Sequence, residues 1–206
     1  MSLLGLAGRA GSGKDTVARM LVDNFPGKVV VISLADPLKR FIQAAFGFEP
    51  DQLWGSTERR AEKSARFPDG PTAREALQQL GTEWGRRLHP DVWVRHAIRT
   101  ARAVQAGQGD YDCREWQLGS SAAPPPRLIV IPDVRFDNEL ATIQEASGGD
   151  VWLIRRPATE TLPGGIPNHA SEVGIPVERF NRVLNNTGTL KDLEVQVLRL
   201  ARGGTV

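Results

Sequence analysis

Short apolar runs alternate along this chain with longer stretches of helical spacing. The apolar runs lie at residues 3–6, 29–33, 128–131, 151–154 and 182–184, and each is short enough to be a buried strand. Between them, apolar side chains recur every three or four positions, which places them on one face of a helix. Because strands that alternate with helices form parallel sheets, the pattern predicts an α/β fold with an open parallel sheet.

The longest helical stretch is predicted over residues 74–88. Thr72 and Glu75 have the spacing of a capping box at its start. Its core face is expected to contain Leu77, Leu80, Trp84 and Leu88. Two glycines inside it, Gly81 and Gly85, indicate the close approach of another backbone or of a ligand.

Two stretches show neither the short apolar runs of strands nor the three-to-four-residue spacing of helices. Residues 49–71 are rich in charged side chains, and we expect a mobile segment with short helical pieces. Residues 107–126 are rich in Gly, Ser, Ala and Pro, which predicts a surface loop or partial disorder.

Composition limits the class of protein. A chain of 206 residues is long enough for one α/β domain with a small inserted lid, and a single cysteine excludes a disulfide framework. No apolar run approaches the roughly 20 residues of a membrane span. We therefore expect a cytoplasmic protein without membrane contact. The formal charge of +2 does not by itself indicate a nucleic-acid partner.

The strongest chemical signal is the glycine-rich stretch between the first strand and the first helix. Gly8, Gly13 and Lys14 fit G-x-x-x-x-G-K, the motif whose backbone N–H groups surround phosphates, with Asp15 where Ser or Thr is usual. Thr16 follows, and its hydroxyl is the candidate Mg²⁺ ligand. The predicted ATP-binding residues of this stretch are Gly8, Gly11, Ser12, Gly13, Lys14, Asp15 and Thr16.

Other candidates follow the second and third strands, because ligands of open parallel sheets collect at the carboxyl ends of the strands. Asp36, Lys39 and Arg40 follow the second strand; Asp36 is also a predicted helix N-cap, and both cations could be plain surface charges. Asp133 is placed just past the third strand, where a carboxylate would face Mg²⁺, and Arg135 could hold an acceptor phosphate. A turn carboxylate and a structural ion pair are the respective alternatives.

The last candidates lie near the C-terminal strands. Arg155 and Arg156 precede a segment rich in glycine and proline, which is typical of a hinged cover that excludes water during phosphoryl transfer. The turn at residues 185–188, with Asn186, is placed beside the phosphate loop, where its backbone could hold an adenine.

Taken in order, several stretches resemble the deoxynucleoside monophosphate kinases best known from bacteriophages. They are GLAGRAGSGKDT, SLADPLKRF, REALQQLGTEWGRRLHPDVWV, IPDVRFDNEL, NHASE and NNTGTL. The resemblance implies a three-layer P-loop kinase fold, with a five-stranded parallel sheet, helices on both faces and a small lid. It also implies Mg²⁺-dependent transfer of the γ-phosphoryl group of ATP to a deoxynucleoside 5′-monophosphate, in the host cytoplasm if a phage encodes the chain.

The same resemblance assigns roles by position. Residues 1–206 would be one kinase domain, with an acceptor-binding segment at about 36–95 and a lid at about 155–172. The acceptor residues would be Asp36, Lys39, Arg40, Arg74, Gln78, Glu83 and Arg135. Catalysis would rest on Lys14, Asp36, Arg135, Arg155 and Arg156, with Thr16 and Asp133 at the metal. A homodimer is left open.

Two other functions compete with this one. A phosphate acceptor is already ionised and needs no general base, whereas Asp36 stands where kinases of hydroxyl acceptors have one. The first rival is therefore a kinase of dephospho-coenzyme A, or of a hydroxymethylated pyrimidine in phage DNA, with Asp36 as its base. The second is a nucleotide-dependent switch or ATPase, although the base-reading sequences N-K-x-D and T-K-x-D are absent.

Overall fold

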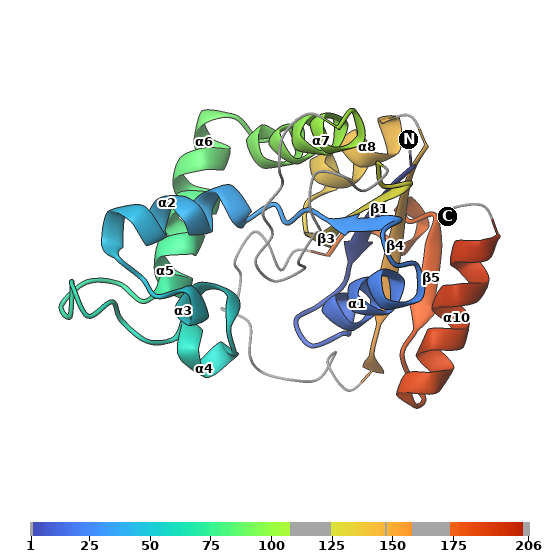
Figure 1. Cartoon of the computed structure of the whole chain (residues 1–206), viewed down its shortest axis with the longest axis horizontal. Helices are drawn as coiled ribbons and strands as arrows, with labels where there is room; N and C mark the ends of the chain where they lie inside the picture. The colour runs from blue at the N-terminus through green and yellow to red at the C-terminus, as the bar shows by residue number, and fades with distance from the viewer. Residues whose placement is uncertain (1, 108–124, 147, 158–173, 204–206) are drawn as a thin grey trace.

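The centre of the molecule is a five-stranded sheet. The structure, a computed structural model, describes residues 2–107, 125–146, 148–157 and 174–203. The strands are β1 (Ser2–Ala7), β2 (Val29–Val31), β3 (Leu128–Val134), β4 (Gly149–Arg155) and β5 (Arg182–Asn185). Their order is β2-β3-β1-β4-β5, and all four neighbouring pairs are parallel, as the α/β prediction requires (Figure 1).

Helices cover both faces of the sheet. Helices α1 (Lys14–Asn24) and α10 (Leu190–Arg202) pack on one face, against Leu4, Leu6 and Trp152 among others. Helices α7 (Val92–Gln105) and α8 (Asp137–Glu145) cover the other face. They pack against the strand residues that alternate with those of the first face, such as Leu3, Ile129 and Ile131. Successive side chains of each central strand therefore enter opposite cores, which explains why these strands are apolar throughout. A short 3-10 helix, η3 (Val177–Arg179), precedes β5.

Residues 36–88 form a separate group of helices beside the sheet, which we call the helical lobe (Figure 1). It consists of α2 (Asp36–Phe46), α3 (Pro50–Trp54), α4 (Thr57–Arg60), α5 (Ala73–Gln78), η1 (Gln79–Gly85) and α6 (Arg86–Leu88). The lobe has a core of its own, made by Ile42, Phe48, Leu53, Ala73 and Ala76. The short helical pieces expected within residues 49–71 are thus present as α3 and α4.

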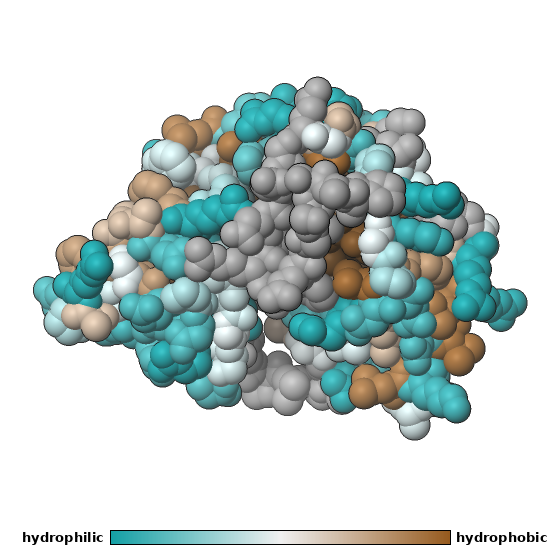
Figure 2. All heavy atoms as spheres, in the orientation of Figure 1, coloured by the Kyte–Doolittle hydropathy of each residue, from teal (hydrophilic) through white to brown (hydrophobic). Residues whose placement is uncertain are grey.

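The predicted core face of the helix over 74–88 is wrong in its second half. Trp84 is 56% exposed and Leu88 is 69% exposed. The chain passes from α5 into the π-helix η1, whose wider turns rotate the later side chains away from the face that α5 buries. Figure 2 shows apolar (brown) residues among hydrophilic (teal) ones at the upper left, where Figure 1 places α6.

The glycines of this helix do mark a close approach, but by a side chain. A Cβ at Gly85 would lie 2.2 Å from Cζ2 of Trp93, and the Trp93 indole N–H donates to the carbonyl oxygen of Gly81 at 2.8 Å. The lobe is therefore fastened to the start of α7 through an indole ring.

The predicted helix N-cap is confirmed at Thr72 and is wrong at Asp36. The Thr72 hydroxyl accepts from the Glu75 N–H, and the Glu75 carboxylate accepts from the Thr72 N–H, which completes the predicted capping box. Asp36 is the first residue of α2, and Ala35 is its N-cap. The Asp36 carboxylate instead accepts from the backbone N–H of Ser33 at 3.2 Å, so it stabilises the turn before the helix.

Two predicted segments lie mainly outside the described residues: the loop within 107–126 and the lid after residue 157. Within the described parts of the chain, no helix is long and apolar enough to cross a membrane.

Candidate functional site

The loop between β1 and α1 has a backbone that only glycine accommodates at its two ends. Gly8, Gly11 and Gly13 have φ angles of 143°, 74° and 108°. A Cβ at Gly8 would lie 2.4 Å from the carbonyl oxygen of Ile154, and one at Gly13 would lie 2.8 Å from Nδ2 of Asn186. These positive φ angles favour glycine, and close contacts with β4 and the turn after β5 add a second requirement for glycine.

Helix α1 begins at this loop. Its N-cap is Gly13 and its first residue is Lys14, so the free N–H groups of its first turn face the same region as the loop. The helix dipole adds partial positive charge there. Asp15 is exposed in this first turn. Together the loop and the helix end form an anion-binding geometry.

The side chain of Lys14 crosses the mouth of the loop. Its Nζ atom donates to the carbonyl oxygens of Gly8 at 2.8 Å and Arg9 at 3.1 Å. The same atom lies 3.7 Å from Oδ1 of Asp133 at the end of β3. The ammonium group is therefore held between the loop and a carboxylate, almost out of contact with water.

Asp133 is the only non-glycine residue with a positive φ in the described part of the chain, at 70°. It lies within β3, which extends to Val134, rather than just past the strand as predicted. Its Oδ2 accepts from Nε and Nη2 of Arg135 at 2.9 and 2.7 Å. Desolvation opposes ionisation, but the charges of Arg135 and Lys14 outweigh it and lower the pKa of Asp133. Asp133 is thus a stable carboxylate, and Arg135 makes the ion pair that was its alternative role.

A cavity of about 290 Å³ opens beside the loop. Its lining residues come from the loop, from the end of β4 and from the turn before α10: Gly11, Gly13, Lys14, Asp15, Thr16, Arg156, Asn186, Gly188 and Leu190. The Asn186 amide donates to the carbonyl oxygen of Ser12 at 2.9 Å, and its backbone N–H donates to Arg155 at 2.7 Å. The structure thus brings together three sets of candidates that lie far apart in the sequence.

Two of these candidates have side-chain surroundings on which the sequence made no prediction. Asn186 contacts the loop through its side chain, whereas the prediction concerned its backbone. The Ser12 hydroxyl is buried and has no hydrogen-bond partner among the described residues. It faces Gly8, so it lies inside the loop rather than on its outer surface.

The candidates on α2 form a second group. Asp36 is buried, and Lys39 is only 8% exposed. The Lys39 ammonium lies 5.4 Å from the centre of the Trp54 ring, and no carboxylate among the described residues pairs with it. A nearly buried cation held against an aromatic face is available to a negatively charged or carbonyl-bearing ligand.

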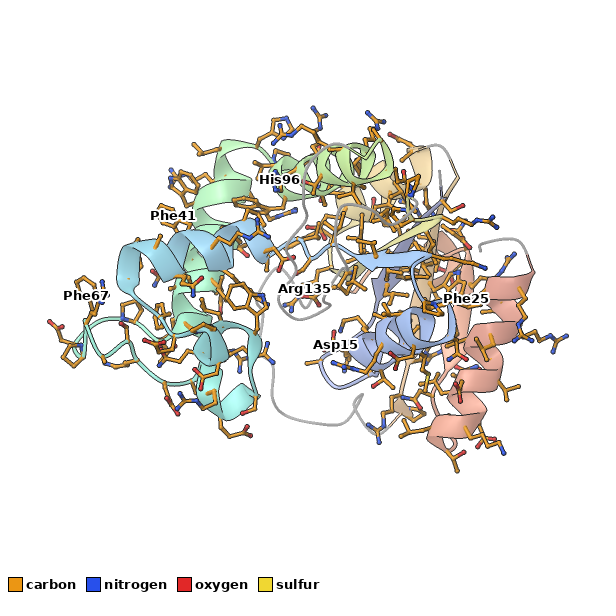
Figure 3. The ribbon with its side chains drawn as sticks, viewed as in Figure 1. Asp15, Phe25, Phe41, Phe67, His96 and Arg135 are labelled. Carbon is orange, nitrogen blue, oxygen red and sulfur yellow. The ribbon has the colours of Figure 1, made fainter. Side chains whose placement is uncertain are left out.

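Arg40 and Asp36 act on His96 of α7. Burial and the charges of Arg99 and Arg40 lower the pKa of His96, while Asp36 acts in the opposite direction. Figure 3 shows His96 above the start of α2, Asp15 at the start of α1, and Arg135 near the middle of the molecule, between the lobe and α1.

Among the residues that the structure describes, no ion pair joins the three other expected acceptor residues to the site. Arg74 and Glu83 are exposed, and Gln78 is half-buried at the end of α5. Their assignment remains a prediction of the resemblance.

The structure also reveals a polar group that the sequence did not single out. Arg86 contacts Asn138 and Glu139, which lie about fifty positions later in the chain. Burial raises the pKa of Glu139, although hydrogen bonds from Arg135 and Phe136 and the charge of Arg86 act against that rise. No local signal marks Arg86, because its partners belong to another element.

Comparison with known proteins was made for the whole chain. No family model matches it. A protein of Acanthamoeba polyphaga mimivirus, provisionally named a deoxynucleotide monophosphate kinase, is 30% identical over 207 residues, covering 96% of this chain and 95% of the viral protein. The deoxynucleoside-5′-monophosphate kinase of Escherichia phage T5 is 24% identical over 254 residues, covering 95% and 94% of the two chains.

Proposed function

Because this chain belongs to the deoxynucleoside monophosphate kinase family, we propose that it transfers the γ-phosphoryl group of ATP to a deoxynucleoside 5′-monophosphate. It is a nucleotide kinase, and the products of the proposed reaction are ADP and a deoxynucleoside diphosphate. The observation that carries the proposal is the position of Lys14, between a glycine loop of positive φ and the carboxylate of Asp133. That arrangement matches the needs of a bound triphosphate.

The donor site is assigned to the loop and the start of α1. Backbone N–H groups of the loop and the positive end of the helix would surround the β- and γ-phosphates. Lys14 would exchange its two carbonyl partners for phosphate oxygens, which are stronger acceptors because they are charged. The cavity beside the loop, with Asn186 and Leu190 on its wall, would hold the ribose and adenine of ATP.

The donor set fits a magnesium ion. Thr16 supplies a hydroxyl, Asp133 supplies a carboxylate kept ionised by its neighbours, and Mg²⁺ prefers oxygen ligands with phosphates completing its shell. When bound at Thr16 and Asp133, the ion would neutralise negative charge that develops on the phosphates during transfer. No group of three or more metal-ligating side chains occurs among the described residues, so nucleotide oxygens and water would provide the remaining ligands.

The acceptor site is assigned to the segment 36–95 together with Arg135. An oxygen of the acceptor phosphate attacks the γ-phosphorus, the bond from that phosphorus to the β-phosphate oxygen breaks, and ADP leaves. The acceptor is already ionised, so the chain need only position it and offset its charge. Arg135 is proposed to hold the acceptor phosphate, and Asp36, Lys39 and Arg40, with Arg74, Gln78 and Glu83, to hold the nucleoside.

A lid at residues 155–172 is proposed to cover the two nucleotides. Arg155 and Arg156 begin this segment, and Arg156 lines the cavity beside the loop. Guanidinium groups near the transferred phosphoryl would stabilise its charge, and the cover would exclude water that could hydrolyse ATP. The whole chain would then act as one kinase domain.

One observation favours a second candidate. Asp36 is a buried carboxylate that follows β2, the place where a base for a hydroxyl acceptor is expected. The acceptor would then be dephospho-coenzyme A or a hydroxymethylated pyrimidine, including one within DNA. Asp36→Asn separates the two candidates, because it would abolish transfer to a hydroxyl and leave most transfer to a phosphate.

The deciding experiment measures ADP formation with Mg²⁺ and ATP against a panel of acceptors. The panel contains the four deoxynucleoside monophosphates, the matching ribonucleotides, dephospho-coenzyme A and hydroxymethylated DNA. We expect rapid turnover with at least one free deoxynucleoside monophosphate. Turnover with a hydroxyl acceptor alone would establish the second candidate, and ATP hydrolysis without any acceptor would favour a switch or ATPase.

A further inference from the structure

The carboxylate of Glu139 is shared between the helical lobe and the segment Asp133–Arg135, which consists of the end of β3 and the residue after it. We call this segment the turn, because Asp133 has a positive φ. Its Oε1 accepts from Nη1 of Arg86, at the end of the lobe, at 3.1 Å. Its Oε2 accepts from the backbone N–H groups of Arg135 and Phe136, at 2.9 and 3.1 Å. The Glu139 side chain is only 5% exposed, so water does not substitute easily for any of these donors.

Arg86 makes further contacts with the start of α8 and with Pro90. Its guanidinium carbon lies 3.5 Å from the centre of the Phe136 ring, and Nη2 donates to Oδ1 of Asn138 at 2.9 Å. Nη1 also donates to the carbonyl oxygen of Pro90 at 2.9 Å. The Asn138 amide donates in turn to Oδ1 of Asp91 at 2.7 Å. The planar guanidinium therefore has a single well-defined position, which a lysine could reproduce only in part, through its charge.

The turn that Glu139 holds is the one on which the proposed chemistry depends. Arg135 donates to Glu139 through its backbone and to Asp133 through its side chain. Asp133 has a positive φ and lies 3.7 Å from the Lys14 ammonium. A strained conformation of this kind persists only where neighbouring groups fix it. Glu139 is one of the groups that fix it, and Arg86 is the contact that joins Glu139 to the lobe.

We propose that Arg86 is a positioning residue that transmits the position of the helical lobe, through Glu139, to the Asp133–Arg135 turn. This inference rests on the proposed function, because it assigns the lobe to the acceptor and the turn to the phosphates. Binding of the acceptor to the lobe then fixes the positions of Asp133 and Arg135 relative to Lys14. Phosphoryl transfer is sensitive to such positions, since a displacement of about 1 Å can reduce a rate a hundredfold.

A purely structural role for the pair is the competing explanation. A buried ion pair often contributes little to net stability, because desolvation of both charges offsets their attraction. Loss of one partner still destabilises a protein, so a stability measurement alone does not separate the two roles. The separating quantities are the division of the effect between kcat and KM, and the protection of the two backbone N–H groups bound by Glu139.

The experiment compares Arg86→Met, Arg86→Lys, Glu139→Gln and the double variant Arg86→Met with Glu139→Gln. The matched control is Arg87→Met, since Arg87 is the next residue of the same helix and is exposed. For each protein we measure kcat, the KM for ATP, the KM for the acceptor, the melting temperature, and hydrogen exchange of the Arg135 and Phe136 amides by NMR.

Arg86→Met should lower kcat by about tenfold or more while the KM for ATP changes by less than about twofold, because donor binding is left intact. Exchange of the two amides should accelerate by about tenfold or more, and Arg86→Lys should recover part of both effects. The double variant should be no slower than its slower parent within about twofold, since both changes break the same link. Arg87→Met should match the wild type.

Three results would overturn the inference: an unchanged kcat in a less stable Arg86→Met protein, unchanged amide exchange, or fully additive losses in the double variant. If Arg86→Met does not fold, the same criteria apply to Arg86→Lys and Glu139→Gln. A wild-type protein that phosphorylates no deoxynucleoside monophosphate would refute the proposed function, whereas the amide exchange would still decide whether Arg86 controls the turn.

Discussion

Replacing Gly8 by alanine tests whether the geometry of the phosphate loop is indispensable. At φ of 143° the backbone is in a region that only glycine adopts readily, which costs about 1–3 kcal/mol for another residue. The new Cβ would also lie 2.4 Å from the carbonyl oxygen of Ile154, and this part of β4 cannot yield easily because Ile154 is paired with Leu184 of β5. Overpacking of this kind costs a further 1–3 kcal/mol, roughly. We expect Gly8→Ala to lose at least about 2 kcal/mol of unfolding free energy.

Gly27→Ala is the matched control. Gly27 has a φ of 72°, but no heavy atom lies within 4 Å of its ideal Cβ position. Backbone strain alone should therefore reduce stability by about 1–2 kcal/mol, with no effect on the loop. Urea unfolding and titration with ATP measure the two consequences separately. Equal losses of stability in the two variants, or wild-type affinity for ATP in Gly8→Ala, would refute the steric argument.

Three further predictions test other parts of the structure. Lys14→Met should reduce kcat by about a hundredfold or more, because preorganised charge at the transferred group is lost, whereas Lys28→Met should leave steady-state turnover unchanged. Thr189→Ala removes the N-cap bond to Asp192 and should lower the unfolding free energy by about 1 kcal/mol in urea titrations; a loss below a few tenths would contradict it. Burial and nearby arginines lower the pKa of His96 below its ordinary value of 6.5, so the unfolded chain binds the proton more readily and stability decreases as pH falls below 6.5. His96→Asn should flatten the melting temperature between pH 7 and 5, and an unchanged slope would show that His96 does not cause it.

Features with a local cause could be predicted from the sequence. The strands are continuous apolar runs because both faces of the sheet are covered, and the glycine loop has a distinctive spacing. The capping box at Thr72 also depends only on residues three positions apart. These signals fixed the fold class and placed Lys14 correctly at the loop.

Features with a distant cause could not be predicted in this way. The prediction that Trp84 and Leu88 lie on the buried face of a helix was wrong. Both are exposed by the π-helix, which forms where Trp93 packs against Gly81 and Gly85. The contact between Arg86 and Glu139 joins residues 53 positions apart, and neither residue stands in a motif that names the other. From the sequence alone, Arg86 looks like an ordinary surface arginine and Glu139 like a residue at the start of a helix, and nothing indicates that the two are in contact.

The π-helix also limits how the length of this chain can change. Each residue of an α-helix rotates the following chain by about 100° about the helix axis, and each residue of the wider π-helix by somewhat less. Deleting one residue between Gln79 and Gly85 would therefore turn the Arg86 guanidinium roughly a quarter turn away from the Glu139 carboxylate. A deletion of one residue at the exposed positions 65–69, between α4 and α5, would not rotate the π-helix. Gaps in an alignment of related chains should therefore collect before Thr72 and avoid the seven residues of the π-helix.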